Sequence, residues 1–597
     1  MAVHPPRPRS RPPDGTYLSF ASALRLDKGG RTAVMLMRAR MLAEHRGVRS
    51  VIATVGDVPD LARTDDVLRG RGALTEDVAV TNIYDDYATR EVAAADSGTD
   101  ALAVLDLVAT PDNRDDGTPY RISYRQPDVA PGAEPEVVDY LRADGTVSVR
   151  RHLSPQRFEL VDRDGRVVRR HKSRASFVQQ WLRELVGPDD GFVIADSRRT
   201  LPLLFGLSGS GMHVVATFHN PHTVGDARWD SPLKGPYVKV LERLHDLDGL
   251  VLLTERHRDE IALRAGATAN LFVVPNAVEP PELPDPPPPR DRARLVTVAR
   301  LEGQKRVSHA LRALEIARRT DPALRLDVYG DGSSRGVLEA TARDLELDGA
   351  VTFHGYDPRA RDAISTAAAF LLTSNHEGYP LATLEAMSRG CPVISYDVRF
   401  GPREQIDDGV DGYLVPSGDV ETFAARILDL TSDPDRIARM SAAACMKASE
   451  HSPRRFADDW AEVFRQVRAQ AGSRLTLQRT RLHGVRLGRR RFAARLRTAA
   501  TGHGASDVDA LTATLDVVGE TTGEVVQVPA NIGRPLVSPR ADGFRITAPF
   551  DHATVATTLG AQPVRVRLNV VWHNACWMAD VARGHTTEDR LSLERVS

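Results

Sequence analysis

This sequence of 597 residues contains only three cysteines, Cys391, Cys445 and Cys576, and they lie far apart. Their spacing fits neither a disulfide framework nor a zinc cluster, which favours a reducing compartment such as the cytoplasm. No run of about 18 apolar residues, the length of a membrane-crossing helix, is present, and the N-terminus lacks the apolar stretch of a signal peptide. We therefore expect a cytoplasmic protein whose contact with a membrane, if any, is peripheral.

The sequence also lacks a charge imbalance, since its formal net charge is -1. With 42% hydrophobic and 27% charged residues, this composition excludes fibrous, disordered and membrane-spanning classes. The chain is too long for a single hydrophobic core, so we expect two large domains with attachments. The charge is uneven along the chain, because no acidic residue occurs from Val463 to Ser506.

The N-terminal part is predicted to form a Rossmann-like domain over residues 15–278, after a disordered leader at 1–14. An apolar strand, the turn Gly29-Gly30, an amphipathic helix and a second strand make a βαβ unit at its start. Between about residues 110 and 172 the pattern changes to period two, with Asp-Gly turns between short apolar runs. This segment is predicted to be an antiparallel β insertion.

A proline-rich linker at residues 279–290 is predicted to end this domain. Short apolar strands then alternate with helical stretches, which predicts a second Rossmann-like domain and a closing helix over 291–470. The fold class is therefore α/β, with two nucleotide-binding-type domains around a hinge and a cleft between them.

The C-terminal part begins with a strongly basic segment, predicted as a connector over residues 471–505. Its arginines, from Arg474 to Arg497, would attract a polyanion or an anionic membrane, although a solvated basic helix is an equally simple interpretation. Nucleic acid is disfavoured because stacking aromatics are not interleaved with the arginines. Residues 506–597 alternate apolar and polar positions, which predicts a β-sandwich-like accessory domain.

Two basic residues follow the first strand of the second Rossmann-like domain. Cleavage of a sugar from a nucleotide diphosphate needs fixed positive charge where the leaving group develops negative charge. Arg300 and Lys305 lie at the strand's carboxyl end, where ligands of α/β domains bind. They could hold one diphosphate, or be two ordinary surface charges.

Two carboxylates eight residues apart, Glu377 and Glu385, flank a turn and the start of a helix. The first-turn amides of that helix, with Gly378, Tyr379 and Leu381, could face a donor phosphate. Glu377 could then accept hydrogen bonds from sugar hydroxyls and Glu385 could reach a ribose. The alternative is a helix with one capping and one exposed acid.

Taken together, these segments resemble family-4 retaining glycosyltransferases of the GT-B fold. In that family the arginine and lysine bind the donor diphosphate. The first glutamate contacts the transferred sugar and the second contacts the ribose. The backbone at the positions of His354 and Gly355 contacts the nucleotide base. The resemblance rests on Val298-Ala299-Arg300-Leu301, Lys305, Tyr329-Gly330-Asp331-Gly332, Phe353-His354-Gly355, Glu377-Gly378 and Glu385-Ala386.

The segment Phe218-His219-Asn220-Pro221-His222 gives candidates on the acceptor side. A zinc site is one interpretation of the two histidines, but no third ligand accompanies them, and either could be structural. The resemblance aligns His219 with a histidine near the reacting sugar and makes His222 an acceptor-side candidate. Gly29 and Gly30 would let the backbone approach a donor or acceptor phosphate.

The first domain and the segment 396–402 resemble poly(glycerol-phosphate) alpha-glucosyltransferases and related enzymes that decorate wall teichoic acids. This resemblance implies a UDP-hexose donor, an anionic polymer acceptor, retention in alpha linkage without a metal or other cofactor, and a homo-oligomer assembled through the β insertion. A protein O-glycosyltransferase, a non-catalytic partner or chaperone, and a GT-B epimerase or phosphorylase are the alternatives. The sequence leaves the transferred hexose and the acceptor open.

Overall fold

The computed structural model describes most of the chain, and the account below concerns these residues. Most of the predicted leader, four residues of the predicted linker, and Arg474, Arg489 and Arg490 lie outside them. The described residues are 11–24, 29–90, 99–100, 107–129, 132–225, 228–266, 268–282, 284, 288–357, 359–471, 476–488, 491–501, 511–533, 543–549, 551–573, 575–587 and 591–595.

The chain divides into two compact units. The first comprises residues 1–217, 246–250 and 457–468, and the second comprises 218–245, 251–456 and 469–597. Among the described residues, no helix is both long and apolar enough to cross a membrane.

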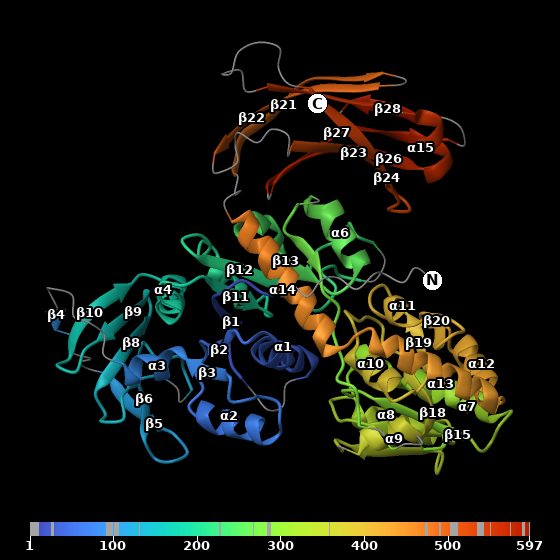
Figure 1. Cartoon of the computed structure of the whole chain (residues 1–597), viewed down its shortest axis with the longest axis horizontal. Helices are drawn as coiled ribbons and strands as arrows, with labels where there is room; N and C mark the ends of the chain where they lie inside the picture. The colour runs from blue at the N-terminus through green and yellow to red at the C-terminus, as the bar shows by residue number, and fades with distance from the viewer. Residues whose placement is uncertain are drawn as a thin grey trace. The chain divides into compact units, whose positions relative to one another are not determined.

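The N-terminal Rossmann-like sheet has seven strands in the order β14-β13-β12-β11-β1-β2-β3 (Figure 1). Neighbours among β12, β11, β1, β2 and β3 are parallel. The predicted βαβ unit is present, with α1 joining β1 to β2. The elements are β1 (Thr16–Ala21), α1 (Gly30–Arg46), β2 (Arg49–Thr54), α2 (Leu61–Gly70), β3 (Val78–Asn82), β11 (Gly191–Ala195), η1 (Leu201–Leu204), β12 (Met212–Phe218), α5 (Gly235–Glu242), η2 (Leu244–Asp246), β13 (Gly249–Leu252), α6 (Glu255–Ala265) and β14 (Leu271–Val273).

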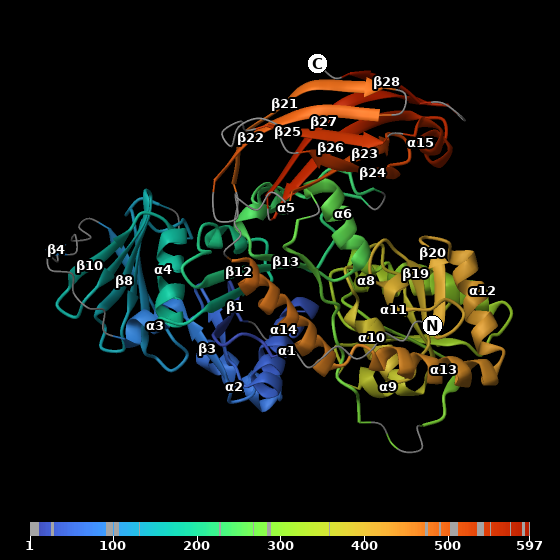
Figure 2. The ribbon, with the colours of Figure 1, turned by 45° about the horizontal axis from the view of Figure 1, so that its top comes forward.

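The predicted β insertion is a second seven-stranded sheet, in the order β4-β10-β9-β8-β7-β6-β5, and its neighbouring strands are antiparallel. Its Asp-Gly turns place Gly117, Gly145 and Gly165 at positive φ, which glycine adopts without strain. Helices α3 (Ile83–Thr89) and α4 (Arg174–Val186) pack on this sheet (Figure 2). Phe177 of α4 stacks on Phe158 of the sheet. The strands are β4 (Thr99–Asp100), β5 (Val108–Asn113), β6 (Pro119–Arg125), β7 (Val137–Leu141), β8 (Val147–Leu153), β9 (Gln156–Val161) and β10 (Arg166–His171).

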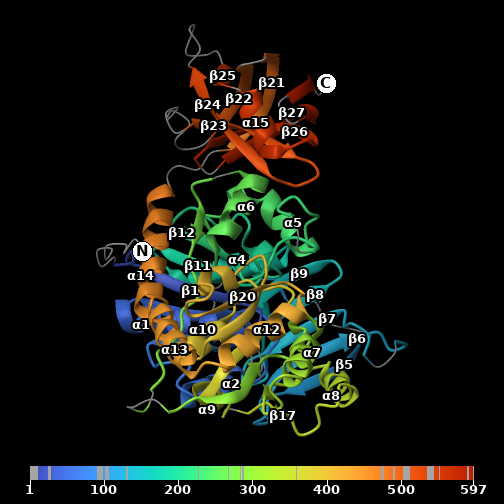
Figure 3. The same cartoon turned by 90° about the vertical axis from the view of Figure 1, so that its right-hand side faces the viewer.

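The second Rossmann-like sheet is parallel, with six strands in the order β17-β16-β15-β18-β19-β20. Alternate residues of β15 enter different cores: Leu295 packs with α7, α8 and α12, and Val296 packs with α9 and α10. Figure 3 shows α7, α8 and α12 on one side of this domain and α9 and α10 on the other. Both faces are therefore covered, as a parallel sheet requires. The elements are β15 (Asp291–Val298), η3 (Gly303–Lys305), α7 (Val307–Arg318), β16 (Arg325–Tyr329), α8 (Arg335–Asp344), β17 (Val351–Gly355), α9 (Ala360–Thr366), β18 (Ala367–Leu372), α10 (Leu381–Ser388), β19 (Val393–Asp397), α11 (Pro402–Gln405), β20 (Gly412–Pro416), α12 (Val420–Thr431), α13 (Pro434–Ser449) and α14 (Pro453–Gln470).

The C-terminal region differs from the prediction at two points. Residues 476–501, predicted as part of a basic connector, form the paired strands β21 and β22, and the region is one eight-stranded antiparallel sheet in place of a two-sheet sandwich (Figure 2). The reason is visible in β22, where arginines alternate with the buried Phe492, Ala494 and Leu496. The order is β21-β22-β25-β24-β23-β26-β27-β28. The elements are β21 (Thr476–Gly488), β22 (Arg491–Thr501), β23 (Leu511–Gly519), β24 (Val525–Gly533), β25 (Gly543–Pro549), α15 (His552–Leu559), β26 (Pro563–Trp572), β27 (Ala575–Thr586) and β28 (Leu591–Arg595).

Candidate active site

The predicted donor site is built on two neighbouring strands of the second Rossmann-like sheet. Strands β15 and β18 are parallel, so the loops that follow them leave the sheet at the same edge. Hydrogen bonds join these loops: the Asn375 amide donates to the Gln304 carbonyl at 2.9 Å, and the Gln304 side chain donates to the His376 carbonyl at 2.8 Å. The Thr373 hydroxyl also donates to the carbonyl of Lys305 at 3.0 Å. The two loops therefore form one hydrogen-bonded unit.

Lys305 and Glu377, 72 residues apart in sequence, meet in an ion pair. Lys305 Nζ lies 2.6 Å from Glu377 Oε1, and only 18% and 9% of the two side chains are exposed. Arg300 is exposed on the same loop as Lys305 and has no ion pair within the described part of the chain. The site thus contains one cation already neutralised by an acid and one whose charge faces solvent.

The loop that carries Arg300 is fixed by a glycine loop after β16. A Cβ on Gly330 would overlap the Ala299 carbonyl, and one on Gly332 would crowd the backbone of Leu301. The Leu301 amide donates to the Asp331 carbonyl at 2.9 Å. The two glycines therefore permit a close backbone approach that orients the Arg300 loop.

The His219 segment lies against the Glu377 loop. A Cβ on Gly378 would overlap the His219 carbonyl, so the backbones of these two positions are in direct contact. The Tyr237 hydroxyl donates to the Asn220 carbonyl at 2.9 Å, which fixes the backbone next to His219. The structure therefore brings His219 together with Glu377, Gly378 and Lys305.

His222 does not serve as an acceptor-side residue, contrary to our expectation from the resemblance. It is fully buried, and its Nδ1 lies 3.0 Å from Nε2 of His257, on which it stacks. Burial, with the neighbouring cations, lowers the pKa of His222 to about 2 and that of His257 to about 3. The pair is a neutral structural contact, and no group of three or more metal-ligating side chains occurs among the described residues.

Arg399 is a residue whose structural role sequence reasoning missed. Its guanidinium makes a buried ion pair with Glu260 of α6, and its Nη1 donates to the Thr223 hydroxyl at 3.1 Å. It thereby ties the loop after β19 to the residue that follows His222. The only signal in the sequence was the segment 396–402, which contributed to the resemblance without indicating this contact.

Helix α10 begins after Pro380 and contains Glu385, the residue predicted to bind the ribose. Burial raises the pKa of the Glu385 carboxyl, while Arg361 and Arg389 oppose the shift. Leu381 is half-buried at the first helical position. Tyr379 is buried with its hydroxyl near His451, so its side chain is directed into the protein, and its carbonyl accepts from Asn276 at 2.9 Å.

The predicted base-binding backbone lies at the end of β17. His354 stacks on Tyr329 with ring centroids 4.3 Å apart, and its Nε2 lies 2.8 Å from Asp327 Oδ1. Gly355 has a φ of 69°, and its carbonyl accepts from the Gly330 amide at 2.7 Å. This segment is therefore connected to the glycine loop that supports Arg300.

Gly29 and Gly30 lie in the other compact unit. Gly29 caps the N-terminus of α1 in an extended conformation, and both glycines are exposed. A small pocket in the same unit lies where β1 and β11 end and α1 begins. It is lined by Phe20, Ala21, Ser22, Ala23, Arg31, Thr32, Met35, Asp196 and Ser197.

Comparison with known proteins assigns the region that contains this site. Residues 280–445 match the family model described as glycosyl transferases group 1. These residues form a group 1 glycosyl transferase domain. They include every predicted donor-site residue from Arg300 to Glu385, and the resemblance drawn from the sequence is confirmed.

Among curated proteins, the poly(glycerol-phosphate) alpha-glucosyltransferase of Bacillus subtilis is 26% identical over 302 residues, covering 50% of this chain and 44% of that protein. The poly(ribitol-phosphate) alpha-N-acetylglucosaminyltransferase of Staphylococcus aureus is 24% identical over 297 residues, covering 49% and 59%. The chain thus spans about half the length of these relatives. The GtfA subunit of a UDP-N-acetylglucosamine–peptide N-acetylglucosaminyltransferase from Streptococcus gordonii is 31% identical over 204 residues, 31% of this chain and 38% of that protein.

Solved structures establish the fold. S. aureus TarM, in a complex that contains UDP, aligns with a TM-score of 0.58 and 17% identity over 75% of this chain and 99% of TarM. A GtfA/B complex chain aligns with a TM-score of 0.59 and 18% identity, covering 76% and 100%. The predicted GT-B fold, with its β insertion and a C-terminal β-rich region, is confirmed.

Proposed function

We propose that this protein is a retaining glycosyltransferase that moves a hexose from a UDP-sugar to an anionic poly(polyol phosphate) of the teichoic-acid type, in alpha linkage. The main support is the geometry around Lys305: the ion-paired Lys305 and the exposed Arg300 follow β15, Glu377 follows the neighbouring β18, and the His219 backbone lies against Gly378. The group 1 domain and the two polymer-modifying relatives support the substrate classes.

In this proposal the donor diphosphate competes with Glu377 for Lys305. As the diphosphate approaches, Lys305 turns from the Glu377 carboxylate to the phosphate oxygens, and Arg300 adds its unpaired charge. The Glu377 carboxylate is then released to accept hydrogen bonds from the sugar hydroxyls. The ion pair thus keeps both side chains in place until the donor arrives, which reduces the reorganisation needed at the reaction.

The transfer step needs only groups that the substrates and this chain provide. The bond between the anomeric carbon and the diphosphate oxygen breaks, and the acceptor hydroxyl oxygen bonds to that carbon on the same face. The hydroxyl proton passes to the leaving diphosphate oxygen, which is held by Arg300 and Lys305. We propose that this fixed positive charge replaces a catalytic metal, and that the reaction takes place in the cytoplasm.

The test is a transfer assay with purified full-length protein. UDP-glucose and UDP-N-acetylglucosamine are each offered with poly(glycerol phosphate), poly(ribitol phosphate) and a serine-rich peptide, with and without EDTA. We expect transfer to a polyol-phosphate polymer that is unaffected by EDTA and gives an alpha-linked product by NMR. Loss of transfer in EDTA would contradict the metal-free mechanism, and a beta-linked product would contradict retention.

A protein O-glycosyltransferase is the second candidate, favoured by the 31% identity to the GtfA subunit. The same panel separates the two, because this candidate predicts transfer to the peptide and none to either polymer. Donor hydrolysis without any acceptor distinguishes both from a non-catalytic partner, which would leave UDP-sugars intact.

A further inference from the structure

Three neighbouring strands of the C-terminal sheet carry exposed arginines on one face. In β22 the side chains of Phe492, Ala494 and Leu496 enter the apolar core of the sheet, so Arg491 and Arg495 point to the opposite face. The same alternation in β25 places Ile546 in the core and Arg545 outside. The exposed arginines are Arg481 and Arg486 on β21, Arg491 and Arg495 on β22, and Arg545 on β25, and we call this set the basic face.

The basic face holds like charges opposite one another. Arg495 of β22 is directly paired in register with Arg545 of β25. Like charges in such cross-strand positions destabilise a sheet. No ion pair is made by the five arginines within the described part of the chain. This arrangement is unfavourable for folding alone, which indicates a ligand that supplies the missing negative charge.

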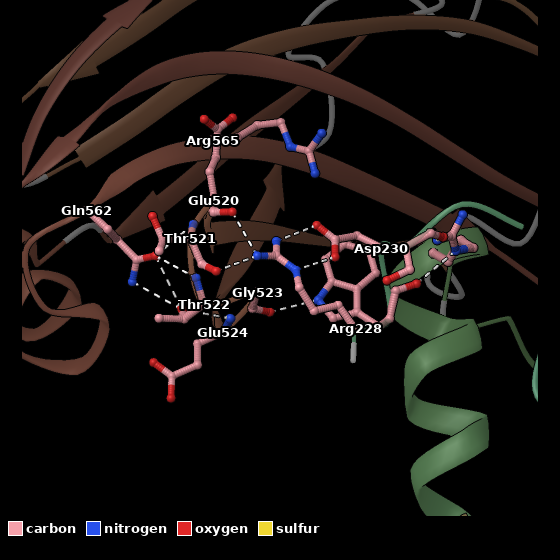
Figure 4. A network of polar contacts seen from close by, with 12 residues as sticks. Arg228, Asp230, Glu520, Thr521, Thr522, Gly523, Glu524, Gln562 and Arg565 are labelled. Atoms are coloured by element: carbon pink, nitrogen blue, oxygen red, sulfur yellow. Dashed lines mark hydrogen bonds and ion pairs between the residues drawn. The ribbon is translucent and has the colours of Figure 1, made fainter. Parts of the chain in front are cut away.

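The other half of the same sheet face is used differently. In β23 and β26, Asp516 and Arg567 form a buried ion pair 2.9 Å long, and the Arg567 guanidinium lies over the Trp229 ring at 5.2 Å. The neighbouring residues Arg228 and Trp229 also form hydrogen bonds with the hairpin turn between β23 and β24 (Figure 4). Arg228 donates to the carbonyls of Glu520 at 2.8 Å and Thr521 at 2.6 Å, and Trp229 donates to the carbonyl of Gly523 at 2.8 Å. The part of the face on β23 and β26 thus contacts Arg228 and Trp229, while the part on β21, β22 and β25 remains an exposed cationic surface.

The chemistry of the face selects among polyanions. The aromatic side chains Phe492, Phe544 and Trp572 pack in the core of the sheet and are not available to stack on bases, which disfavours nucleic acid. The large apolar side chains that are exposed in the described residues all lie outside this sheet, so nothing on it would insert into a lipid surface. A flexible, repeating phosphodiester chain is the ligand that fits.

We propose that the basic face is a secondary binding site for the polyol-phosphate polymer, separate from the site of transfer. This inference rests on the proposed function. A polymer held by several arginines remains attached to the protein while its nearby hydroxyls reach the transfer site, so its effective concentration there is raised. Affinity increases with the number of phosphates engaged and decreases with salt, because exposed charges are screened.

The experiment uses the full chain with Arg491→Gln, Arg495→Gln and Arg545→Gln combined. Binding of fluorescently labelled poly(glycerol phosphate) is measured by anisotropy without donor, and transfer is measured to the polymer and to glycerol phosphate as a one-unit acceptor. We expect the polymer Kd and KM to rise about tenfold at low salt, corresponding to roughly 0.5 kcal/mol for each exposed charge. The kcat, the KM for glycerol phosphate and donor hydrolysis should stay unchanged.

Arg583→Gln is the matched control, because Arg583 is an exposed arginine on β27, near the other edge of the same sheet, in register with Glu594 of β28 on one side and Arg565 of β26 on the other. It should leave polymer binding unchanged. Unaltered polymer binding in the triple variant would overturn the proposal, as would an equal rise in KM for glycerol phosphate. Loss of binding to phosphatidylglycerol vesicles with normal polymer binding would assign the face to a membrane instead. Because polymer binding is measured without donor, the binding results stand even if no transfer is detected.

Discussion

The donor-site loops and the basic face both concentrate positive charge, but they manage it in opposite ways. At the donor site Lys305 is paired with Glu377, and Asp327 lies between Arg294 and His354. On the basic face Arg495 is opposite Arg545, and among the described residues no acid forms an ion pair with either. The first arrangement holds charges in fixed positions, and the second leaves them in solvent.

This difference predicts two kinds of dependence. A preorganised and largely buried ion pair acts through geometry, so changing it should alter turnover strongly and salt should matter little. Exposed arginines act through a screened field, so changing them should alter affinity modestly and salt should matter much. Donor-site variants should therefore lose turnover, and basic-face variants should lose salt-sensitive affinity for the polymer.

Removing the ion pair at the donor site is expected to have the largest effect. Lys305→Ala or Glu377→Ala should reduce kcat by about a hundredfold or more, because each removes a preorganised contact with the transition state. Arg300→Ala should reduce it less, since Lys305 still holds the diphosphate. Initial rates with a saturating UDP-sugar measure this effect. Turnover near the normal level in both variants would disprove the assigned roles.

The close contact between Gly378 and His219 can be broken without removing a charge. In Gly378→Ala the added Cβ would overlap the His219 carbonyl, so the Glu377 loop or the histidine segment must shift. A displacement of about 1 Å at a reacting centre can cost up to a hundredfold in rate, and we expect a loss of roughly 10- to 100-fold in kcat. Gly336→Ala, on α8 with open space around it, is the control and should be neutral.

The donor-site residues could be predicted from the sequence, but the contacts between them could not. The positions of Arg300, Lys305 and Glu377 at the ends of adjacent strands could be predicted, because apolar strands and the residues after them are visible in the sequence. The pairing of Lys305 with Glu377 could not, since it depends on which strands become neighbours across 72 residues. His222 is another case: its role was decided by His257, 35 residues away, whose position only the fold determines.

The basic segment shows a different limit. The alternation of arginines with Phe492, Ala494 and Leu496 was present in the sequence, but the density of arginine outweighed it and predicted a connector. Period-two patterns identify a strand only when one face is clearly apolar. In β22 the arginines of one face are as prominent in the sequence as the apolar residues of the other. Only the pairing with β25 shows that the apolar residues enter a core and that the arginines face outward.

Loss of the contacts between Arg228 and the C-terminal sheet should have an intermediate effect. Arg228→Ala removes two hydrogen bonds to the β23–β24 turn and the ion pair with Asp230. Hydrogen bonds to charged groups contribute about 1.5–3 kcal/mol, so we expect faster amide exchange in residues 228–231 and 519–524. Hydrogen exchange with mass spectrometry measures this change. Arg436→Ala, a half-buried ion-paired arginine on α13, is the control and should leave these peptides unchanged.

The smallest expected effect is on stability as a function of pH, through His222 and His257. Their pKa values are lowered in the folded state, to about 2 and about 3, first by burial and then by cations that include Arg399 and Lys234. The unfolded chain, with an ordinary histidine pKa near 6.5, therefore binds more protons than the folded chain below that pH. Stability contributed by the neutral pair is full above about pH 6.5 and falls as the pH decreases, by up to about 1.4 kcal/mol per pH unit for each histidine. In urea unfolding followed by tryptophan fluorescence, His222→Gln combined with His257→Gln should flatten the decline between pH 6.5 and 5. An unchanged slope would show that other buried groups, such as His451 with its pKa lowered to about 4, control the acid sensitivity.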